Sequence, residues 1–215
     1  MPATCPGYTP YLRGGRPDDR GGRLPETTDD GADHDLVVLL SEDGHPCGTA
    51  PRTGVHTTDT PLHLAFSCYV RDDEGRVLLT RRAVTKRTWP GVWTNSFCGH
   101  PRPGEDPAAT VHRYAEHELG LTIDELRLVL PDFRYRAVDP AGIVENELCP
   151  VYVAHTSAQP VRNPDEVEES RWLEPDELRL ALAAAPWALS PWLVLQLTEL
   201  ERAGAFADLP SGARP

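Results

Sequence analysis

The sequence predicts an α+β protein in which a mixed, largely antiparallel β-sheet is flanked by helices. Segments with the alternating pattern of strands outnumber helical segments, and short turns join most of these strands. The chain has 215 residues, of which 40% are hydrophobic, enough for one sizeable core. Its 22 prolines and 17 glycines stay below the roughly 25–30% that marks a low-complexity chain.

Residues 1–35 differ in composition from the rest of the chain, with many Pro, Gly, Asp and Arg residues and almost no branched aliphatic ones. Such a segment buries too little apolar surface to offset the entropy of ordering it. We therefore expect a disordered tail over 1–35, one domain over 36–205 and a flexible tail over 206–215. No apolar run approaches the roughly 20 residues of a membrane helix, and the N-terminus has no hydrophobic export signal. A cytoplasmic protein without membrane contacts is expected.

The charge balance limits the partners. Twenty-one basic and thirty-three acidic residues give a net charge of −12, which disfavours general nucleic-acid binding. An anionic small molecule would need a local cationic pocket or a divalent metal. The five cysteines are an odd number without CxxC spacing, so neither a disulfide framework nor a cysteine-only zinc site fits, and we expect reduced thiols. The expected oligomeric state is a monomer or a weak homodimer.

Strands are predicted in order along the chain. The apolar run 35–40 ends at a turn beginning with Ser41. In 62–70, Leu62, Leu64, Phe66, Cys68 and Val70 share one face, and His63, Ala65, Ser67 and Tyr69 share the other. Further strands are expected at 76–82, near 127–138, at 143–154 and at 168–173. The turn Asp139–Gly142 joins two of them as a hairpin.

Three helices are predicted from their end signals. The first begins at Asp106, an N-cap followed by Pro107, and ends at Gly120. The second covers about 175–185. The third begins at Ser190-Pro191 and continues to about residue 203.

One carboxylate lies on the wrong side of the first helix. With Val111 at 0° and 100° per residue, Glu118 falls at −20°, in the middle of the apolar stripe. An unpaired buried charge is costly, so Glu118 needs a cation or a metal as its partner. The alternative is a rotated helix end that leaves Glu118 half exposed.

A pair of carboxylates repeats this anomaly in the strand 143–154. Glu145 and Glu147 lie side by side on a face with apolar residues. Two like charges this close raise the pKa of one of them or require a shared cation. If 139–142 is a four-residue loop, Arg134 and Arg136 lie opposite them, and ordinary ion pairs suffice. A register shift of one residue brings Tyr135 to that face instead.

Histidines and a cysteine supply further candidate groups. His56, His63 and His100 together with two carboxylates suit Mn²⁺, Zn²⁺ or Fe²⁺ better than an all-oxygen Mg²⁺ site. Cys98 lies two residues before His100, so in an extended segment both side chains point the same way. Taken singly, each of these residues is more often a core or surface residue.

A longer motif resembles the Nudix box, a loop–helix signature of enzymes that act on diphosphates. It reads Gly99-x5-Glu105-x7-Arg113-Tyr-Ala-Glu-His-Glu118-Leu-Gly-Leu. Tyr114 and His117 replace two of the usual glutamates, which hold the metals that activate water in Nudix hydrolases. Pyrophosphate hydrolysis is therefore disfavoured.

Several ordered segments over about 36–201 resemble the type 1 isopentenyl-diphosphate isomerase family. They are His56-Thr-Thr-Asp-Thr, Leu62-His-Leu-Ala-Phe, Trp89-Pro-Gly-Val-Trp-Thr-Asn, Cys98-Gly-His-Pro, Asp132-Phe-Arg-Tyr-Arg-Ala and Gly142-Ile-Val-Glu-Asn-Glu. The resemblance implies a Nudix-like α/β/α sandwich. It also implies an enzyme that interconverts isopentenyl and dimethylallyl diphosphate by protonation and deprotonation.

The same resemblance assigns roles to residues. It places Mn²⁺ or Zn²⁺ on His56, His63, His100, Glu145 and Glu147, and Mg²⁺, bridging to the substrate diphosphate, on Glu118. The implied catalytic groups are Cys98, Glu147 and Tyr135, and the implied substrate-binding residues are Arg52, Arg82, Lys86 and Trp192. Arg52 stands where a lysine is expected, which keeps the charge but changes the donor geometry.

The chemistry explains why such groups are needed. An unactivated alkene is a poor base, so the acid must be strong and held close to it. We hypothesise that Glu147 with Tyr135 is the acid on one side of the substrate and Cys98 the base on the other. Trp192 would stabilise the tertiary carbocation between them.

Three other interpretations fit parts of the sequence. A Nudix hydrolase would release phosphate or a monophosphate, and Tyr114 and His117 argue against it. A non-catalytic module that binds a diphosphate or a protein leaves Cys98 and the glutamates without a purpose. A plain core with cross-strand ion pairs does not account for the ordered family segments.

Overall fold

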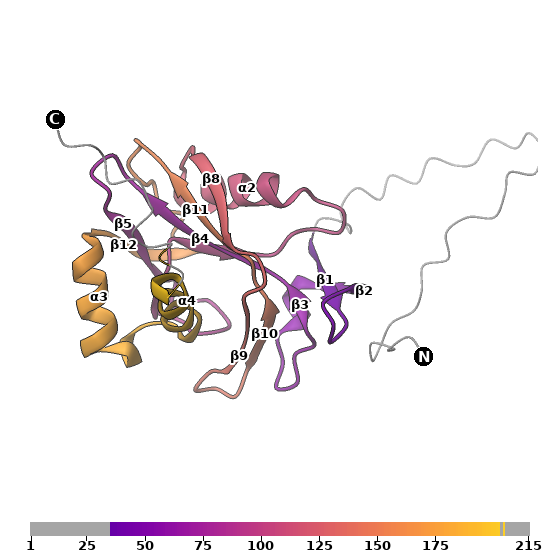
Figure 1. Cartoon of the computed structure of the whole chain (residues 1–215). Coiled ribbons are helices and arrows are strands. Elements are labelled where there is room, and N and C mark those ends of the chain that lie inside the picture. Colours follow the sequence, from indigo (N-terminus) through magenta and orange to yellow (C-terminus); the bar gives the residue numbers. More distant parts are fainter. Residues whose placement is uncertain (1–34, 203, 205–215) are drawn as a thin grey trace, which may run out of the picture.

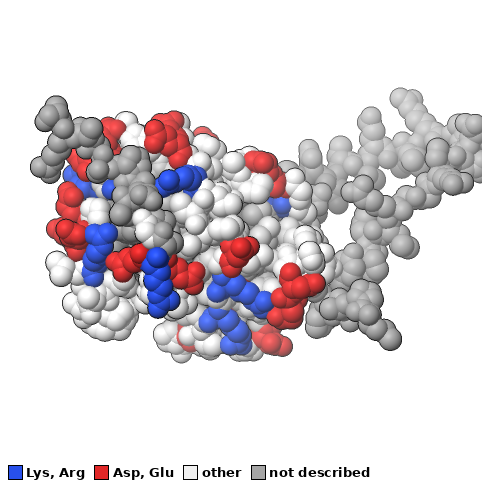
Figure 2. Space-filling model, viewed as in Figure 1, with Lys and Arg blue, Asp and Glu red and all other residues white. Residues whose placement is uncertain are grey.

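The computed structural model describes residues 35–202 and 204. Apart from Asp35, the predicted tails 1–35 and 206–215 lie outside the described residues. In the described part, no helix is both long enough and apolar enough to cross a membrane. Basic and acidic side chains lie side by side on the face drawn in Figure 2, so this face carries no uniformly basic surface.

The strands form two sheets instead of the single sheet that the sequence predicts. The larger sheet contains β4 (Phe66–Arg71), β5 (Val77–Arg82), β6 (Trp93–Thr94), β7 (Phe97–Gly99), β8 (Asp124–Leu130), β11 (Val151–His155) and β12 (Val167–Leu173). Its main path is β12-β5-β4-β11-β8, with β6 on β5 and β7 on β4. Only the β4–β11 pair in it is parallel.

The smaller sheet has the order β2-β1-β3-β10-β9. Its strands are β1 (Leu36–Leu40), β2 (Pro46–Pro51), β3 (His63–Leu64), β9 (Arg134–Val138) and β10 (Val144–Leu148). Only β3 and β10 run parallel. The prediction of a mixed, largely antiparallel arrangement is therefore confirmed, but β2, β6 and β7 were not predicted.

The predicted helices are present, and their end signals work as expected. In α2 (Pro107–Leu119) the Asp106 side chain accepts a hydrogen bond from Ala109 N at 2.9 Å, and Gly120 ends the helix in the left-handed conformation, φ 59°. The others are α3 (Pro175–Ala184) and α4 (Pro191–Arg202), with the short η2 (Pro186–Ala188) between them. A one-turn helix, α1 (Arg52–Val55), was not predicted.

The larger sheet is the middle layer of an α/β/α sandwich, with α2 on one face and α3 and α4 on the other (Figure 1). The alternation predicted for 62–70 separates the two layers. Phe66, Cys68 and Val70 pack in the cluster that includes α2, and Ala65 and Tyr69 pack in the cluster that includes α4. Both faces are buried, and His63 itself is 0% exposed.

Each of three predicted long strands is split where the chain passes from one sheet to the other. The first breaks at Ala65, between β3 and β4, and the last breaks at Cys149-Pro150, between β10 and β11. The third break lies at 131–133, between β8 and β9. Proline lacks the N–H that would continue a ladder, which accounts for the break at Pro150. The three crossings bring both sheets together at one junction.

The hairpin of β9 and β10 has a three-residue loop instead of the four-residue one considered above. Asp139 N donates to Ile143 O at 2.8 Å, and Gly142 adopts φ 86°, the conformation that a three-residue loop requires. Glu147 is therefore paired with Tyr135 and Glu145 with Ala137. The alternative of cross-strand ion pairs with Arg134 and Arg136 is wrong.

The cysteines follow the expectation only in part. Cys68, Cys98 and Cys149 are free thiols. Cys47 is disulfide-bonded, so the expectation that it is reduced is wrong.

Candidate active site and metal centre

A cavity of about 460 Å³ opens where the two sheets meet. The candidate residues that line it come from both sheets, from α1, α2 and α4, and from the loops after β5 and β7. They are Arg52, His56, Arg82, Lys86, Cys98, His100, Glu118, Tyr135, Glu145, Glu147 and Trp192. His63 is fully buried behind the cavity wall and contacts the cluster through its ring nitrogen.

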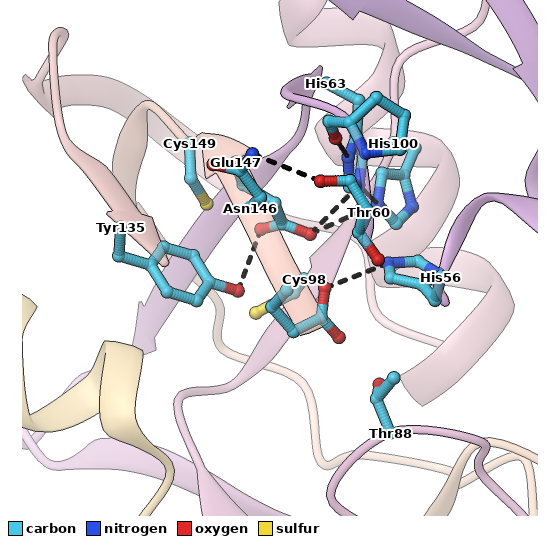
Figure 3. Close-up of polar contacts among 12 residues, drawn as sticks. His56, Thr60, His63, Thr88, Cys98, His100, Tyr135, Asn146, Glu147 and Cys149 are labelled. Carbon is cyan, nitrogen blue, oxygen red and sulfur yellow. Dashed lines mark hydrogen bonds and ion pairs between the residues drawn. The ribbon is translucent and has the colours of Figure 1, made fainter. Parts of the chain in front are cut away.

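Three histidines and one glutamate converge in the manner of a metal centre. One potential ligand atom from each of His56, His63, His100 and Glu147 lies within 4.8 Å of all the others. The parallel pairing of β3 and β10 sets His63 opposite Glu147, and His100 directly follows β7. In Figure 3 the imidazoles gather on one side of the Glu147 carboxylate and the Tyr135 hydroxyl lies on the other.

The distances define an electron-rich cluster. His63 Nε2 lies 3.2 Å from His100 Nε2 and 3.5 Å from Glu147 Oε1, and His100 Nε2 lies 3.3 Å from the same oxygen. His63 Nδ1 lies 2.9 Å from Pro61 O, so Nδ1 carries a hydrogen and Nε2 points at the cluster. Burial lowers the pKa of His100, which favours the neutral imidazole that binds metals.

Two buried atoms beside the cluster lack hydrogen bonds. His56 Nε2 lies 2.9 Å from Glu145 Oε2, but their orientation is not that of a hydrogen bond, and both atoms are buried without a hydrogen-bond partner. Buried polar atoms without a hydrogen-bond partner are what a bound cation would satisfy. The residues present therefore fit a divalent metal, with Glu145 next to the four-residue group.

Glu147 connects this cluster to a phenol. Its Oε2 accepts a hydrogen bond from the Tyr135 hydroxyl at 2.9 Å, while its Oε1 faces the histidines. Burial raises the pKa of Glu147, but the hydrogen bonds from His100 and His63 outweigh it and hold this pKa well below the usual range. Burial raises the pKa of Tyr135, so the phenol keeps its proton.

Cys98 approaches the cavity from the larger sheet. The β4–β7 pairing sets it opposite Ser67, whose Oγ lies 3.4 Å from the sulfur. The thiol also donates to Asn95 Oδ1 at 3.2 Å. Burial raises the pKa of the Cys98 thiol to about 12, so the sulfur is protonated at neutral pH.

The cations at the cavity mouth are already paired with protein groups. Arg52 Nε lies 2.5 Å from Asp35 Oδ1, and Lys86 forms an ion pair with Glu166. The Arg82 guanidinium donates to Thr88 O at 3.0 and 3.1 Å and stacks over Trp192, 5.5 Å from the ring centre. Arg82 thus contacts both the charged mouth and the aromatic part of the cavity.

The aromatic part is formed around Trp192. Its ring lies 5.8 Å from that of Tyr135 and 5.6 Å from that of Trp89, which meets it edge-on. Trp89 has a left-handed backbone, φ 41°, which is costly for a non-glycine residue and is held by its buried packing.

Glu118 is buried, with 7% of its surface exposed, so the alternative of a half-exposed helix end is wrong. Burial raises the pKa of this carboxyl, and the charges of Lys86, Arg82 and Arg52 oppose the rise. Glu118 lines the same cavity but does not belong to the histidine group. It therefore fits a separate cation between α2 and the cationic mouth.

The departures from the Nudix box have structural roles. Tyr114 OH accepts a hydrogen bond from His100 N at 3.2 Å, and its ring packs so closely on Gly99 that a Cβ there would lie 2.3 Å from a ring carbon. Glu105 accepts from Arg113 at 2.6 and 2.7 Å. These contacts hold the loop that carries Cys98 and His100 against α2.

Some residues around the site were missed by sequence reasoning. Asn95 and Ser67 contact the Cys98 sulfur, and Arg102 lines the cavity with its Nε buried and without a hydrogen-bond partner. Asn95 belongs to the family-like segment that begins at Trp89. A single polar residue in a loop, however, gives no sign in the sequence that it is buried.

Comparison with known proteins adds independent support. The NUDIX domain model matches residues 61–193. The isopentenyl-diphosphate Delta-isomerase of Clavibacter sepedonicus is 63% identical over 165 residues, covering 76% of this chain and 86% of that protein. The proteins of the same name from Agromyces mediolanus and Citrobacter koseri are 60% and 52% identical, covering 81% and 76% of this chain and 84% and 90% of those proteins.

Solved structures resemble the fold. A crystallised protein from Deinococcus radiodurans matches with a TM-score of 0.59 and 21% identity, covering 76% of this chain and 98% of that one. The MutT protein of Methanosarcina mazei matches with a TM-score of 0.54 and 19% identity, covering 67% and 96%. With the domain match and the identity to relatives over most of their length, the chain belongs to the NUDIX superfamily and, within it, to the isopentenyl-diphosphate Delta-isomerase family.

Proposed function

We propose that the protein interconverts isopentenyl diphosphate and dimethylallyl diphosphate by moving a proton at each end of a three-carbon unit. The observation that carries the proposal is that a thiol, Cys98, and a hydrogen-bonded carboxylate–phenol pair, Glu147 and Tyr135, line one cavity with a cationic mouth. The reaction requires one proton to be added at a carbon and another to be removed two carbons away. Two separate acid–base groups in one cavity meet that requirement.

The acid–base roles follow from the groups themselves. Tyr135 with Glu147 adds a proton to the terminal carbon of isopentenyl diphosphate, which leaves a tertiary carbocation. The Cys98 thiolate then takes a proton from C2, which forms the new double bond. In the reverse direction the thiol returns its proton to C2, and Glu147 with Tyr135 accepts one from a methyl group.

The pKa values of Cys98 and Glu147 favour the protonation state from which the reverse direction starts. Burial raises the pKa of Cys98 to about 12, whereas hydrogen bonds from His100 and His63 hold the pKa of Glu147 well below its usual range, although burial alone would raise it. The proton therefore lies on sulfur and the carboxylate is ionised. Each reverse turnover moves one proton from the sulfur side to the carboxylate side, which leaves the site ready for the forward direction.

The diphosphate group is the handle by which the substrate is held. Arg52, Arg82 and Lys86 at the cavity mouth supply charge-assisted hydrogen bonds to its oxygens. This local cationic region also allows a chain of net charge −12 to bind an anion. The hydrocarbon end then lies against Tyr135 and Trp192, and the ring face of Trp192 stabilises the carbocation by up to about 2 kcal/mol.

Two metal positions complete the proposal. His56, His63, His100, Glu145 and Glu147 would hold Mn²⁺ or Zn²⁺, because imidazole nitrogens with carboxylates suit these ions. Glu118 would hold Mg²⁺, which prefers oxygen ligands and substrate phosphates. When bound, these ions strengthen the Glu147 carboxyl as an acid and neutralise the diphosphate charge, respectively.

The hydrocarbon end of the cavity also protects the intermediate. Water reaching the carbocation would trap it as an alcohol, and the buried side chains of Tyr135 and Trp192 limit its access. We further expect the protein to act in the cytoplasm, as a monomer or a weak homodimer.

One experiment tests the whole proposal. Purified protein is incubated with isopentenyl diphosphate, Mg²⁺ and Mn²⁺ in D₂O, and the products are followed by NMR. Deuterium appearing in dimethylallyl diphosphate is the expected result. Release of phosphate or a monophosphate would instead identify a hydrolase, and unchanged substrate would identify a binding module.

A further inference from the structure

Asn95, in the loop between β6 and β7, has its amide orientation fixed by the backbone around it. The residue is fully buried. Its Nδ2 donates to Cys68 O at 3.1 Å and to Phe97 O at 2.7 Å. Only the amide nitrogen can donate to two carbonyl groups, so Oδ1 must point the other way.

That oxygen receives hydrogen bonds from two groups of the proposed reaction. Oδ1 accepts from the Cys98 thiol at 3.2 Å and from the Trp192 indole N–H at 3.0 Å. A third donor, Thr94 Oγ1, lies 2.8 Å away. One buried oxygen therefore joins the sulfur on β7 to the aromatic ring on α4, elements far apart in the sequence.

A second buried chain of hydrogen bonds reaches the same sulfur from the other side. The Tyr69 hydroxyl donates to Gln196 Oε1 at 2.9 Å, and Gln196 Nε2 donates to Ser67 Oγ at 2.9 Å. Both sulfurs, Cys98 and Cys149, lie 3.4 Å from Ser67 Oγ. Because the Cys98 thiol hydrogen is donated to Asn95 Oδ1, the Ser67 hydroxyl is the donor in its contact with the Cys98 sulfur. The network around Cys98 is thus directional, and Asn95 is its acceptor end.

We propose that Asn95 is a positioning residue, whose Oδ1 holds the Cys98 thiol and the Trp192 indole in one fixed geometry. The inference rests on the proposed isomerase activity. With the amide in place, the sulfur is aligned with C2 of the substrate while the ring lies against the carbocation centre beside it. Without the Asn95 amide, the side chains of Cys98 and Trp192 rotate independently. The C2 proton transfer then becomes slower than the other steps.

This role predicts a selective defect. In the part of the chain that the structure describes, the Asn95 side chain forms no hydrogen bond with the cations at the cavity mouth, with Glu147 or with Tyr135. Substrate binding and protonation at the terminal carbon should therefore be preserved. Misplacement of a reacting group by about 1 Å lowers a rate by as much as about 100-fold. For Asn95→Ala we expect kcat to fall about 10- to 100-fold, with the KM for isopentenyl diphosphate within about twofold of the wild type.

The test compares kinetic isotope effects. Wild type and Asn95→Ala are assayed with Mg²⁺ and Mn²⁺ on isopentenyl diphosphate and on the same substrate deuterated at C2. The isotope effect of C2 deuteration should be larger in the variant, because C2 deprotonation has become rate-limiting. The solvent isotope effect, which reports protonation at the terminal carbon, should not increase.

Ser96→Ala is the matched control. Ser96 is the next residue, is equally buried, and loses two hydrogen bonds of its own, from Val70 N and to Leu78 O, both at 2.7 Å. It should lose stability but keep the wild-type isotope effects. If Asn95→Ala does not fold, Asn95→Asp is measured instead. This nearly isosteric variant keeps the acceptor oxygen but loses the anchoring N–H groups. It should show a larger C2 isotope effect than wild type.

The outcomes separate the two proposals. A wild-type protein that forms no dimethylallyl diphosphate overturns the proposed function itself. Two other outcomes overturn the positioning role alone, when the wild type does isomerise. In the first, the C2 isotope effect of the Asn95 variant is unchanged. In the second, its loss of kcat does not exceed that of Ser96→Ala.

Discussion

At the histidine end of the cavity, β3 and β10 of the smaller sheet hold residues that are almost completely buried: His63 is 0% exposed and Glu147 5%. At the cavity mouth, α1 and the loop after β5 carry the cations, and the side chains of Arg52 and Lys86 are 47% and 23% exposed. The buried end carries the candidate acid–base groups. The mouth is partly solvated, and its cations are already paired with carboxylates.

This difference predicts how kcat and KM should respond to substitutions at the two ends. A substrate diphosphate would compete with Asp35 for Arg52 and with Glu166 for Lys86, so the mouth would share or exchange its anions. The net gain in affinity from each cation is therefore modest. Changes at the buried end should lower kcat, whereas changes at the mouth should raise KM.

The largest expected effect is at the buried end. Cys98→Ala removes the group that exchanges the C2 proton, and isomerisation should fall by about 10³-fold or more. Metal content should be unchanged, because Cys98 is not part of the histidine group. NMR measures product formation, and elemental analysis measures the bound metal. Cys149→Ala, a buried thiol that also contacts Ser67 but does not line the cavity, is the control and should stay active. Full activity of Cys98→Ala would remove this residue from the mechanism.

A smaller effect is expected where the two ends meet. Trp192→Ala removes the ring face that stabilises the carbocation, and a loss of about 2 kcal/mol corresponds to roughly 30-fold in kcat. Trp192→Phe keeps a ring face and should retain clearly more activity than the alanine variant. Steady-state kinetics of both variants measure the difference. Equal kcat values would contradict the cation–π role.

The mouth should respond mainly through KM. Glu118→Gln removes the carboxylate proposed to hold Mg²⁺ against the diphosphate, and the KM for isopentenyl diphosphate should rise about tenfold, the effect of about 1.4 kcal/mol. Glu116→Gln, an exposed carboxylate on the same helix, is the matched control and should behave like wild type. An unchanged KM and rate for Glu118→Gln, measured across Mg²⁺ concentrations, would reject the bridging role.

The smallest effect concerns the loop that supports both ends. Although burial raises it, hydrogen bonds from Arg113 and from the Arg102 backbone lower the pKa of Glu105 from 4.5 to about 2. A pKa lowered by folding gives stability that is present above pH 4.5 and is lost as the pH falls towards 2. Solvent screening reduces the stabilisation that this pKa shift represents. Glu105→Gln should therefore lower the free energy of unfolding by about 1–2 kcal/mol at pH 7.

Urea unfolding of wild type and Glu105→Gln at pH 7 and near pH 2 checks this expectation. The difference between the two proteins should shrink at the acid end. A difference that is independent of pH would show that the ionised Glu105–Arg113 pair does not stabilise the loop.

Local patterns predicted much of the fold and singled out three carboxylates of the candidate site. The alternation of 62–70 correctly separated the residues packing towards α2 from those packing towards α4, and Asp106 and Gly120 correctly marked the ends of α2. The misplaced carboxylates Glu118, Glu145 and Glu147 are all buried at the cavity. A charge on an apolar face is visible in the sequence because periodicity alone defines the face.

The register of the hairpin could not be predicted. A three-residue and a four-residue loop are both compatible with Asp139–Gly142, and they differ by one residue in pairing, which exchanges Arg134 and Arg136 for Tyr135 opposite the glutamates. Burial decided between them: Tyr135 is 6% exposed and fills the junction, a place where two unpaired guanidinium groups would be costly.

By itself, the sequence determined which residue types are available to the site and which local elements carry them, because helix caps, turns and alternation depend on near neighbours in the chain. Only the tertiary structure decided that His63 lies beside Glu147, that Cys98 lies beside Ser67, and that Asn95 joins the thiol to Trp192. These contacts link segments far apart in the chain, where three strands cross between two sheets. The packing of both sheets together fixes them, and no local preference encodes that packing.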